Sequence, residues 1–184
     1  MKTERELMLA GELYLASDPE LVALRRRARA LTRQYNTSRE DQIDERRLLL
    51  RDLLGSCGED TEIEPMFQCD YGINIHLGAR VYMNFGCVIL DCAPVSIGER
   101  TLLGPGVHLY AATHPTEPRV RETLRELARP ITIGRNAWIG GGVIVCPGVT
   151  IGDDAVIGAG SVVTKDVPRG VIAHGNPCRV VRKV

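Results

Sequence analysis

The stretch ITIGRNAWIGGGVIVCPGVTIGDDAVIGAGSVVT, residues 131–164, places an aliphatic side chain at every sixth position. The positions two residues before these aliphatic side chains are mostly occupied by small or β-branched residues. Because every second side chain of a strand points to the same face, both sets of side chains should point inward. Glycine follows four of the aliphatic residues, where we expect tight corners at positive φ. One hexad cannot bury its apolar face alone, so the pattern predicts stacked hexads in a parallel β-helix. The aliphatic positions are Ile133, Ile139, Val145, Ile151, Ile157 and Val163.

The same period appears earlier, from residue 69 onward, with a slip of two residues at Cys92-Ala93. It lapses between Leu109 and Ile131, so residues 111–130 should form a long loop excursion from the β-helix. Spacing alone does not give the hand of the coil, and the usual crossover preference favours a right-handed one. The earlier aliphatic positions are Leu77, Met83, Ile89, Ile97, Leu103 and Leu109.

The front of the chain has a different composition. Residues 1–60 hold half of the 23 basic and 23 acidic residues, and only Gly11 precedes residue 55 among the glycines. Such a segment favours helix, and we expect helices near residues 7–14, at about 20–34 and at 39–54. The predicted organisation is an N-terminal helical segment at 1–58, followed by the β-helix at 59–184 with loop 111–130 and a basic C-terminal tail.

Several classes of protein are disfavoured by composition. The formal net charge is zero, which gives no reason to expect a nucleic acid or an anionic membrane surface as partner. No apolar run approaches the roughly 18 residues of a membrane span. The N-terminus shows no secretory signal and the six cysteines are scattered, so we expect a cytoplasmic location with reduced thiols. Phosphate-binding and dinucleotide-binding glycine motifs are absent from the sequence.

The hexads IGRNAW, IGGGVI, IGDDAV and IGAGSV resemble those of the hexapeptide-repeat acyltransferases, whose coils are left-handed. Five further segments resemble the bacterial maltose and galactoside O-acetyltransferases, the maltose type most closely. They are GELY at 11–14, CDYGINIHLG at 69–78, NFGCVILD at 84–91, ATHP at 112–115 and GNPCRVV at 175–181. The resemblance implies transfer of an acetyl group from acetyl-CoA to a hydroxyl of a sugar such as maltose or glucose. It also implies a homotrimer with active sites between subunits.

Two residues are candidates for catalysis. His114 opens the excursion, and an imidazole accepts protons near neutral pH, as activation of a sugar hydroxyl requires. The ATHP match places His114 at the catalytic histidine of the resembling enzymes. Asn84 matches an asparagine of their catalytic site. The alternatives are a histidine that caps a turn and an asparagine that accepts a left-handed corner.

Acceptor residues are suggested mainly by the resemblance. Asp70 and Asp91 match positions near the sugar, and carboxylates accept hydrogen bonds from hydroxyl groups, although either could instead hold a turn. Tyr82, Asp18 and the arginines at 25–27 are weaker candidates, since Tyr82 could simply pack and Asp18 could cap a helix. The galactoside enzymes have serine where Asp70 stands and aspartate where Cys92 stands, a departure that favours glucosyl or maltosyl acceptors.

A groove for acetyl-CoA is expected along the late hexads. The cofactor needs backbone donors beside its pantetheine arm and cations near its phosphates. A basic tail that only keeps the protein soluble is the alternative. Among the residues that match contacts of the family with the pantetheine arm are Trp138, Gly141 and Ala159. Near the C-terminus, a cationic end suited to the cofactor phosphates is formed by Thr164, Lys165, Arg179 and Arg182.

Three rival functions stay open. An acetyltransferase of the same fold could act on serine, an antibiotic or an amino sugar. A zinc hydratase would need imidazoles such as His76, His108 and His114 as ligands, whereas we expect no bound metal. A non-catalytic scaffold is disfavoured by the presence of both His114 and Asn84.

Overall fold

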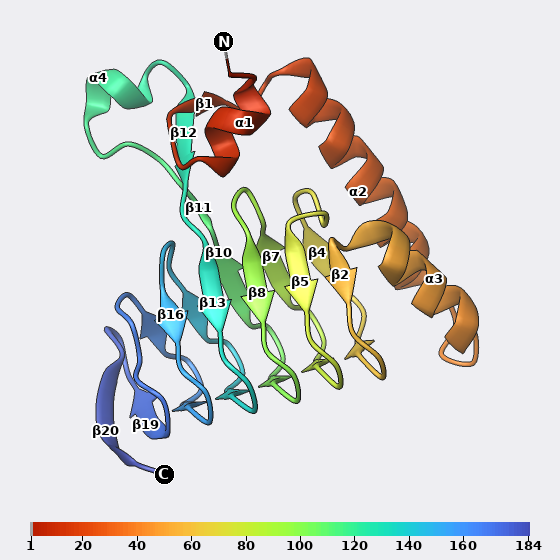
Figure 1. Ribbon diagram of the computed structural model, residues 1–184, viewed down its shortest axis with the longest axis vertical. Coiled ribbons are helices and arrows are strands. Elements are labelled where there is room, and N and C mark those ends of the chain that lie inside the picture. The colour runs from red at the N-terminus through yellow and green to blue at the C-terminus, as the bar shows by residue number, and fades with distance from the viewer. Residues whose placement is uncertain (1) are drawn as a thin grey trace.

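The hexads wind into a parallel β-helix with three flat faces, as a computed structural model that describes residues 2–184 shows. The first face, which is turned to the viewer in Figure 1, contains β2 (Ser56–Cys57), β5 (Ile75–Leu77), β8 (Val95–Ile97), β13 (Ile131–Ile133) and β16 (Thr150–Ile151). The second face contains β3 (Glu62–Ile63), β6 (Tyr82–Met83), β9 (Leu102–Leu103), β14 (Trp138–Ile139), β17 (Val156–Ile157) and β19 (Val171–His174). The third face contains β4 (Gln68–Cys69), β7 (Val88–Leu90), β10 (His108–Tyr110), β15 (Ile144–Val145) and β18 (Val162–Val163).

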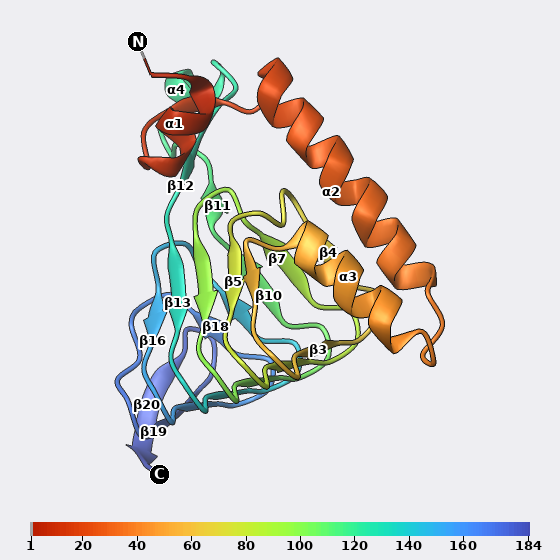
Figure 2. The ribbon, with the colours of Figure 1, turned by 45° about the vertical axis from the view of Figure 1, so that its right-hand side comes forward.

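Each full coil contributes one strand to each face, so the chain turns a corner between successive strands. Two of these corners matter for the site. We call the bend between the second and third faces the second corner, and the bend between the third face and the first face of the next coil the third corner. Figure 2 shows the coils stacked along the axis, with the helices outside them.

The core is made by the predicted aliphatic positions. All twelve of them are buried, and parallel pairing brings them into register, for example Met83 with Leu103 and Leu103 with Ile139. The β-helix begins earlier than residue 69, because β2, β3 and β4 form a first coil with Cys57, Ile63 and Cys69 at the same positions. Cysteine at two of these three positions concealed the period.

The glycines after the aliphatic residues do not have the expected conformation. Gly98 and Gly134 are not at positive φ; the residues two positions later, Arg100 and Asn136, are, with φ of 58° and 53°. A Cβ at Gly98 would lie 2.6 Å from the backbone N of Arg135 on the next coil. Glycine is therefore needed so that neighbouring coils can stack closely, and the prediction of positive φ at these positions was wrong.

The helical segment packs against the start of the β-helix. Its elements are α1 (Glu4–Leu9), β1 (Tyr14–Leu15), α2 (Pro19–Thr37) and α3 (Ile43–Leu53). α2 continues beyond the predicted end at residue 34, and it buries Tyr35, whose hydroxyl donates to the carbonyl of Ile63. α3 begins four residues later than predicted, because residues 38–42 turn the chain between the two helices. In Figure 1, α2 and α3 lie beside the β2 end of the coils.

The excursion is a folded structure and carries its own small sheet. It contains β11 (Ala112–Thr113), α4 (Pro118–Arg121) and β12 (Arg125–Ala128). β12 pairs antiparallel with β11 on one side and with β1 on the other, which ties the N-terminus to the excursion. The backbone N–H of Arg129 donates to the carbonyl of Ala111 at 2.9 Å, so the excursion leaves and rejoins the β-helix at neighbouring points.

The C-terminal residues close the last coil. β20 (Arg179–Lys183) runs antiparallel to β19 and is exposed along its length. Among residues 2–184, no helix has the length and apolar character needed to cross a membrane.

Candidate active site

His114 lies at the third corner, where the excursion begins directly after β11. Its side chain is exposed and lines an open cavity of about 470 Å³ together with Thr113, Leu127, Arg129 and Pro147. Pro115, immediately after it, is buried and anchors the chain at this point. The imidazole is therefore accessible from this cavity.

The two candidate aspartates follow strands of the third face on the two preceding coils. Asp91 is fully buried, and its carboxylate accepts hydrogen bonds from the backbone N–H groups of Asp70 (3.0 Å), Tyr71 (2.8 Å) and Asn74 (3.3 Å). Burial raises the pKa of Asp91 to about 6, although the hydrogen bonds from Tyr71 and Asn74 oppose this. This position favours a role in holding the turn that carries Asp70, and not direct contact with an acceptor.

Asp70 is half-buried in a polar cluster at the same corner. The thiol of Cys92 donates to its carboxylate at 3.5 Å. Burial raises the pKa of Asp70, and the Cys92 contact and the charges of Arg25 and Arg29 lower it in part. Arg25 is held in place by the hydroxyl of Tyr71 at 2.7 Å and by a backbone carbonyl of the helical segment. The arginine cluster of α2 thus contributes one guanidinium to this corner.

One pair at this corner was missed by the sequence reasoning. The hydroxyl of Tyr14 donates to the carboxylate of Glu126 at 2.9 Å, and these residues face each other in the β1–β12 pairing. In the β11–β12 ladder, Thr113 pairs with Leu127, so the next step places His114 across from Glu126. The GELY segment contains Tyr14, but its pairing with a strand more than a hundred residues away leaves no local signal.

Asn84 lies at the second corner, directly after β6. Its side-chain oxygen accepts from the backbone N–H of Phe85 at 2.7 Å, and its φ is not positive, so the alternative of a left-handed corner does not apply. Met83 pairs with Leu103, which places Asn84 beside Gly104, ten residues before His114 along the coil. One chain therefore holds Asn84 and His114 at opposite edges of the third face and does not bring them together.

Several cofactor candidates follow the same edge as Asn84. Trp138 is 58% exposed on the second face, in one row with Tyr82 of β6 and Leu102 of β9. Ile139 pairs with Ile157, so Gly141 lies beside Ala159 at the second corner. The corner carries small residues there, and a Cβ at Gly141 would meet Pro105 at 3.2 Å.

The cationic candidates divide between the two corners. Thr164 and Lys165 follow β18 and are exposed at the third corner, on the side of His114. Arg179 and Arg182 are exposed on β20, which pairs with β19 of the second face, on the side of Asn84. The candidate residues therefore form two groups on one chain, one at each edge of the third face.

Comparison with known proteins now gives the family. Residues 7–58 match the maltose acetyltransferase hexapeptide capping motif, and residues 130–165 match the bacterial transferase hexapeptide of six repeats. Nodulation protein L of Rhizobium meliloti (strain 1021) is 52% identical over 179 residues, which cover 97% of this chain and 98% of that protein. A maltose O-acetyltransferase from Clostridium difficile 630 has a crystal structure with a TM-score of 0.98 and 47% identity, covering 100% of this chain and 98% of that one.

The chain belongs to the maltose acetyltransferase family of hexapeptide-repeat acetyltransferases. A structure of a galactoside acetyltransferase in complex with coenzyme A is also similar, with a TM-score of 0.95, 40% identity and coverage of 100% of this chain and 92% of that one. The hexapeptide repeats imply a left-handed coil, so the hand that the sequence resemblance suggested is confirmed.

In this acetyltransferase, Asp18 occupies a helix-capping position. Its carboxylate accepts from the backbone N–H of Glu20 at 3.0 Å at the start of α2, ahead of Pro19. Such a contact satisfies a backbone donor that the first helical turn leaves free. The capping alternative accounts for this geometry.

The zinc alternative finds little support in the arrangement of the histidines. His76 lies on β5 of the first face, while His108 lies on β10 of the third face, where its Nδ1 is 2.5 Å from the hydroxyl of Tyr110. Within the described part of the chain, no three His, Cys, Asp or Glu side chains are grouped so that they could hold a metal ion.

Proposed function

We propose that this acetyltransferase moves the acetyl group of acetyl-CoA to a hydroxyl of a sugar such as maltose or glucose. The observation that carries the proposal is the exposed His114 at the mouth of a cavity, where the long excursion interrupts the hexad period. Similar proteins are named as maltose and galactoside acetyltransferases, and one of them was solved with coenzyme A.

The chemical step is a direct transfer. His114 accepts the proton of the acceptor hydroxyl, the oxygen attacks the thioester carbonyl, and the C–S bond breaks to release coenzyme A, whose thiolate takes up a proton. Asn84 hydrogen-bonds the acceptor hydroxyl or the imidazole. Because Gly141 has no side-chain donor, its backbone N–H would stabilise the oxyanion.

A complete site would require two copies of the chain in a homotrimer. His114 and Asn84 lie at opposite edges of the third face, so the third corner of one copy must meet the second corner of the next. In a closed ring of three copies the third faces then turn toward the axis. Outward residues of that face are largely apolar and half-buried, among them Val88, Leu90, Ile144 and Val162. Such a surface is suited to contact between copies.

The cofactor would lie between the same two corners. Trp138, Gly141 and Ala159 would line its pantetheine arm, with Arg179 and Arg182 of the same copy near the phosphates. Thr164 and Lys165 would reach it from the neighbouring copy. Opposite charges and exposed backbone donors suit a phosphorylated, amide-containing ligand.

For the acceptor, Asp70 and Tyr82 are the proposed contacts. Asp70 belongs to the copy that supplies His114, and Tyr82 belongs to the copy that supplies Asn84. Asp91 acts indirectly by holding the turn before Asn74. Serine, an antibiotic or an amino sugar remains the alternative acceptor, and the site geometry of the single chain favours none of them specifically.

The proposal is tested by measuring thiol release from acetyl-CoA with a panel of acceptors: glucose, maltose, a galactoside, serine and chloramphenicol. We expect the highest kcat/KM with glucose or maltose. His114→Ala should lose at least about a hundredfold in kcat, since this is the lower range for a removed general base. Its circular dichroism spectrum should match that of the wild type, because the side chain is exposed.

His76→Ala is the matched control, since it removes an exposed imidazole of the first face that does not line the cavity. Near-normal turnover by His114→Ala would contradict the assignment of the base. Activity with serine or chloramphenicol alone would contradict the sugar acceptor and leave the base intact.

A further inference from the structure

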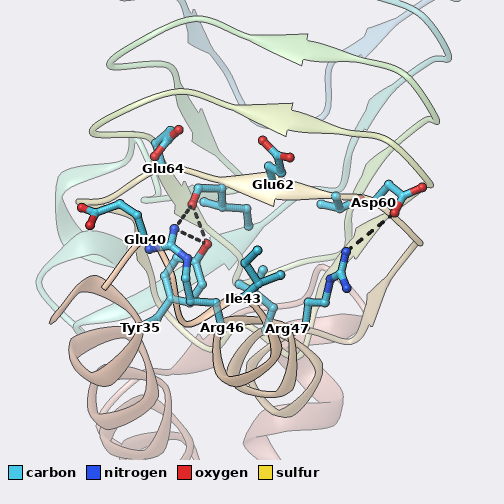
Figure 3. Close-up of a pocket in the computed structure, with 11 residues that line it drawn as sticks. Tyr35, Glu40, Ile43, Arg46, Arg47, Asp60, Glu62 and Glu64 are labelled. Atoms are coloured by element: carbon cyan, nitrogen blue, oxygen red, sulfur yellow. Dashed lines mark hydrogen bonds and ion pairs between the residues drawn. The ribbon is translucent and has the colours of Figure 1, made fainter. Parts of the chain in front are cut away.

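A second cavity lies between the helical segment and the first coil, away from the cavity at His114. It has a volume of about 460 Å³, within the range of small-molecule sites. α3 and the end of α2 form one wall, and the outer side of β3 forms the other (Figure 3). None of the residues proposed above for catalysis or cofactor binding lines it.

The walls carry charges of both signs, with carboxylates in excess. Glu62 lies on β3, Glu64 directly follows it, and Glu40 comes from the helical side, as Figure 3 shows. Glu40 and Glu62 make no ion pair and no side-chain hydrogen bond among residues 2–184. On the right of the view, Arg47 forms a long ion pair with Asp60 at 3.8 Å, and it forms a second long ion pair with Asp44 at 4.0 Å.

Arg46 holds the floor of this cavity. Its guanidinium lies 4.7 Å from the ring centre of Tyr35 and donates through Nη2 to the Tyr35 hydroxyl at 3.1 Å and to the carbonyl of Ile63 at 3.0 Å. Its Nη1 is shielded from solvent and has no hydrogen-bond partner within the described residues. A buried donor without a partner is unfavourable. If the guanidinium rotates toward the cavity, a ligand oxygen there would accept a hydrogen bond from Nη1, which would favour binding of the ligand.

This cavity adjoins the row of residues that leads to Asn84. Glu62 pairs with Tyr82 and Ile63 pairs with Met83, so Glu64 lies beside Asn84 on the neighbouring strand, about 5 Å away along the stack. The pKa of Tyr82 is raised by partial burial first and then by the carboxylates of Glu64 and Glu62, which agrees with this proximity. Glu64 therefore borders both the second cavity and the proposed acceptor position.

The chemistry of the walls selects the ligand. An anion would be repelled by the excess of carboxylates, and a cation would meet the guanidinium groups of Arg46 and Arg47. A neutral molecule with many hydroxyl groups donates to carboxylates and accepts from guanidinium groups. Ile43, 56% exposed at the rim, offers an apolar surface for the C–H face of a sugar ring.

We propose that this cavity is a second carbohydrate subsite and that the natural acceptor is an oligosaccharide. One sugar unit is acetylated between Asn84 and His114, and a further unit of the same chain rests against Glu64, Glu62 and Glu40. This inference rests on the proposed sugar acetyltransferase function and extends it to a class of acceptor.

The test compares kcat/KM for glucose, maltotriose and cellotriose, two neutral trisaccharides that differ in linkage. We expect at least one trisaccharide to exceed glucose by about tenfold, which corresponds to one or two added hydrogen bonds. Glu62→Gln and Glu40→Gln should lower kcat/KM for that trisaccharide about five- to tenfold, mostly through KM, and leave the value for glucose unchanged. Asp52→Asn is the control, because it removes an exposed carboxylate of α3 that does not line the cavity.

The outcomes separate this proposal from the one it rests on. If glucose is acetylated but neither trisaccharide is preferred, or if both variants lower glucose turnover equally, the subsite is wrong while the sugar acetyltransferase function stands. If no sugar is acetylated, the function itself fails. If Glu62→Gln alters the mass measured by gel filtration and light scattering without changing acceptor preference, the cavity is a contact between copies, and the proposal is overturned.

Discussion

Asp91 is a buried carboxylate, and its surroundings have opposing effects on its ionisation. Three backbone N–H groups favour its ionised form, while complete burial disfavours it, and burial prevails in raising the pKa to about 6. A raised pKa means that the folded protein binds a proton more readily than the unfolded chain. Asp91 therefore contributes stability that is present at acid pH and is lost as the pH rises from about 4 to about 6.

For Asp91→Asn we expect a lower free energy of unfolding, because the amide nitrogen would meet the N–H of Asn74 in place of an acceptor oxygen. The difference from the wild type should narrow by roughly 2–3 kcal/mol as the pH rises from 4 to 7, since only the wild type loses the contribution of the protonated acid. Urea unfolding of both proteins at several pH values measures this difference in the free energy of unfolding. A difference that widens toward neutral pH would contradict the raised pKa.

The glycines that permit stacking give a second prediction at this scale. Gly98→Ala should lower the free energy of unfolding by about 2–3 kcal/mol, because its Cβ would overlap the backbone of the next coil. Gly106→Ala is a useful contrast, since Gly106 has φ of 64° and no atom within 4 Å of the added Cβ. It should lose only about 1 kcal/mol from backbone strain. Equal losses would mean that close stacking is not the constraint.

Single residues also mark the limit of what the sequence could predict. The buried positions followed from a period of six, because the period is repeated many times. Asp91 was placed near an acceptor by resemblance, yet its burial depends on which turn folds over it, and that is a tertiary property. Glu126 had no signal at all, since its partner Tyr14 lies at the other end of the chain.

At the level of elements, Asp18 at the start of α2 has two candidate roles, as the cap of the helix and as a contact to the acceptor sugar. Asp18→Ala should lower stability by about 1 kcal/mol through loss of the cap. Asp18→Asn keeps an acceptor oxygen in place and should retain both stability and the KM for the sugar. Steady-state kinetics with glucose or maltose and thermal unfolding check the two effects separately. A raised KM in a stable Asp18→Asn variant would show that the carboxylate contacts the acceptor.

Helices and coils were predictable to different extents for a physical reason. The charge-rich front indicated three helices, but their ends depend on side chains such as Ser38, which donates to the carbonyl of Tyr35 and closes α2. The β1–β12 pairing was not predicted, because a two-residue strand has no period of its own. The predicted β-helix at 59–184 includes β3 and β4 of the first coil but not β2, and the period of six is recognisable only from residue 69 because Cys57 and Cys69 occupy aliphatic positions.

For the whole molecule, the separation of His114 from Asn84 leads to a test of the proposed trimer. Asn84→Ala and His114→Ala should each be nearly inactive alone. When the two chains are co-expressed in equal amounts, random trimers should recover about a quarter of the wild-type sites, because a site needs a native His114 from one copy and a native Asn84 from the next.

The mixed trimers are purified and assayed for thiol release from acetyl-CoA. Light scattering gives their mass. Mixing the two variants after purification, under conditions where subunits do not exchange, is the control and should restore nothing. No recovery in confirmed mixed trimers would place both residues of a site on one chain and refute the division between copies. The sequence could not have predicted the division from spacing, because it follows from which corners of the coil carry the two residues.

The hydrogen bond between Arg129 and Ala111 has an implication for how this protein can diversify. Since the chain returns to the solenoid beside the point where it departs, residues 116–124 can be exchanged, lengthened or shortened with little penalty beyond the entropy of closing a loop. The scaffold beneath would keep its register. Different hydroxyl compounds would therefore be accommodated by replacing the distal part of the excursion while the β-helix stays unchanged.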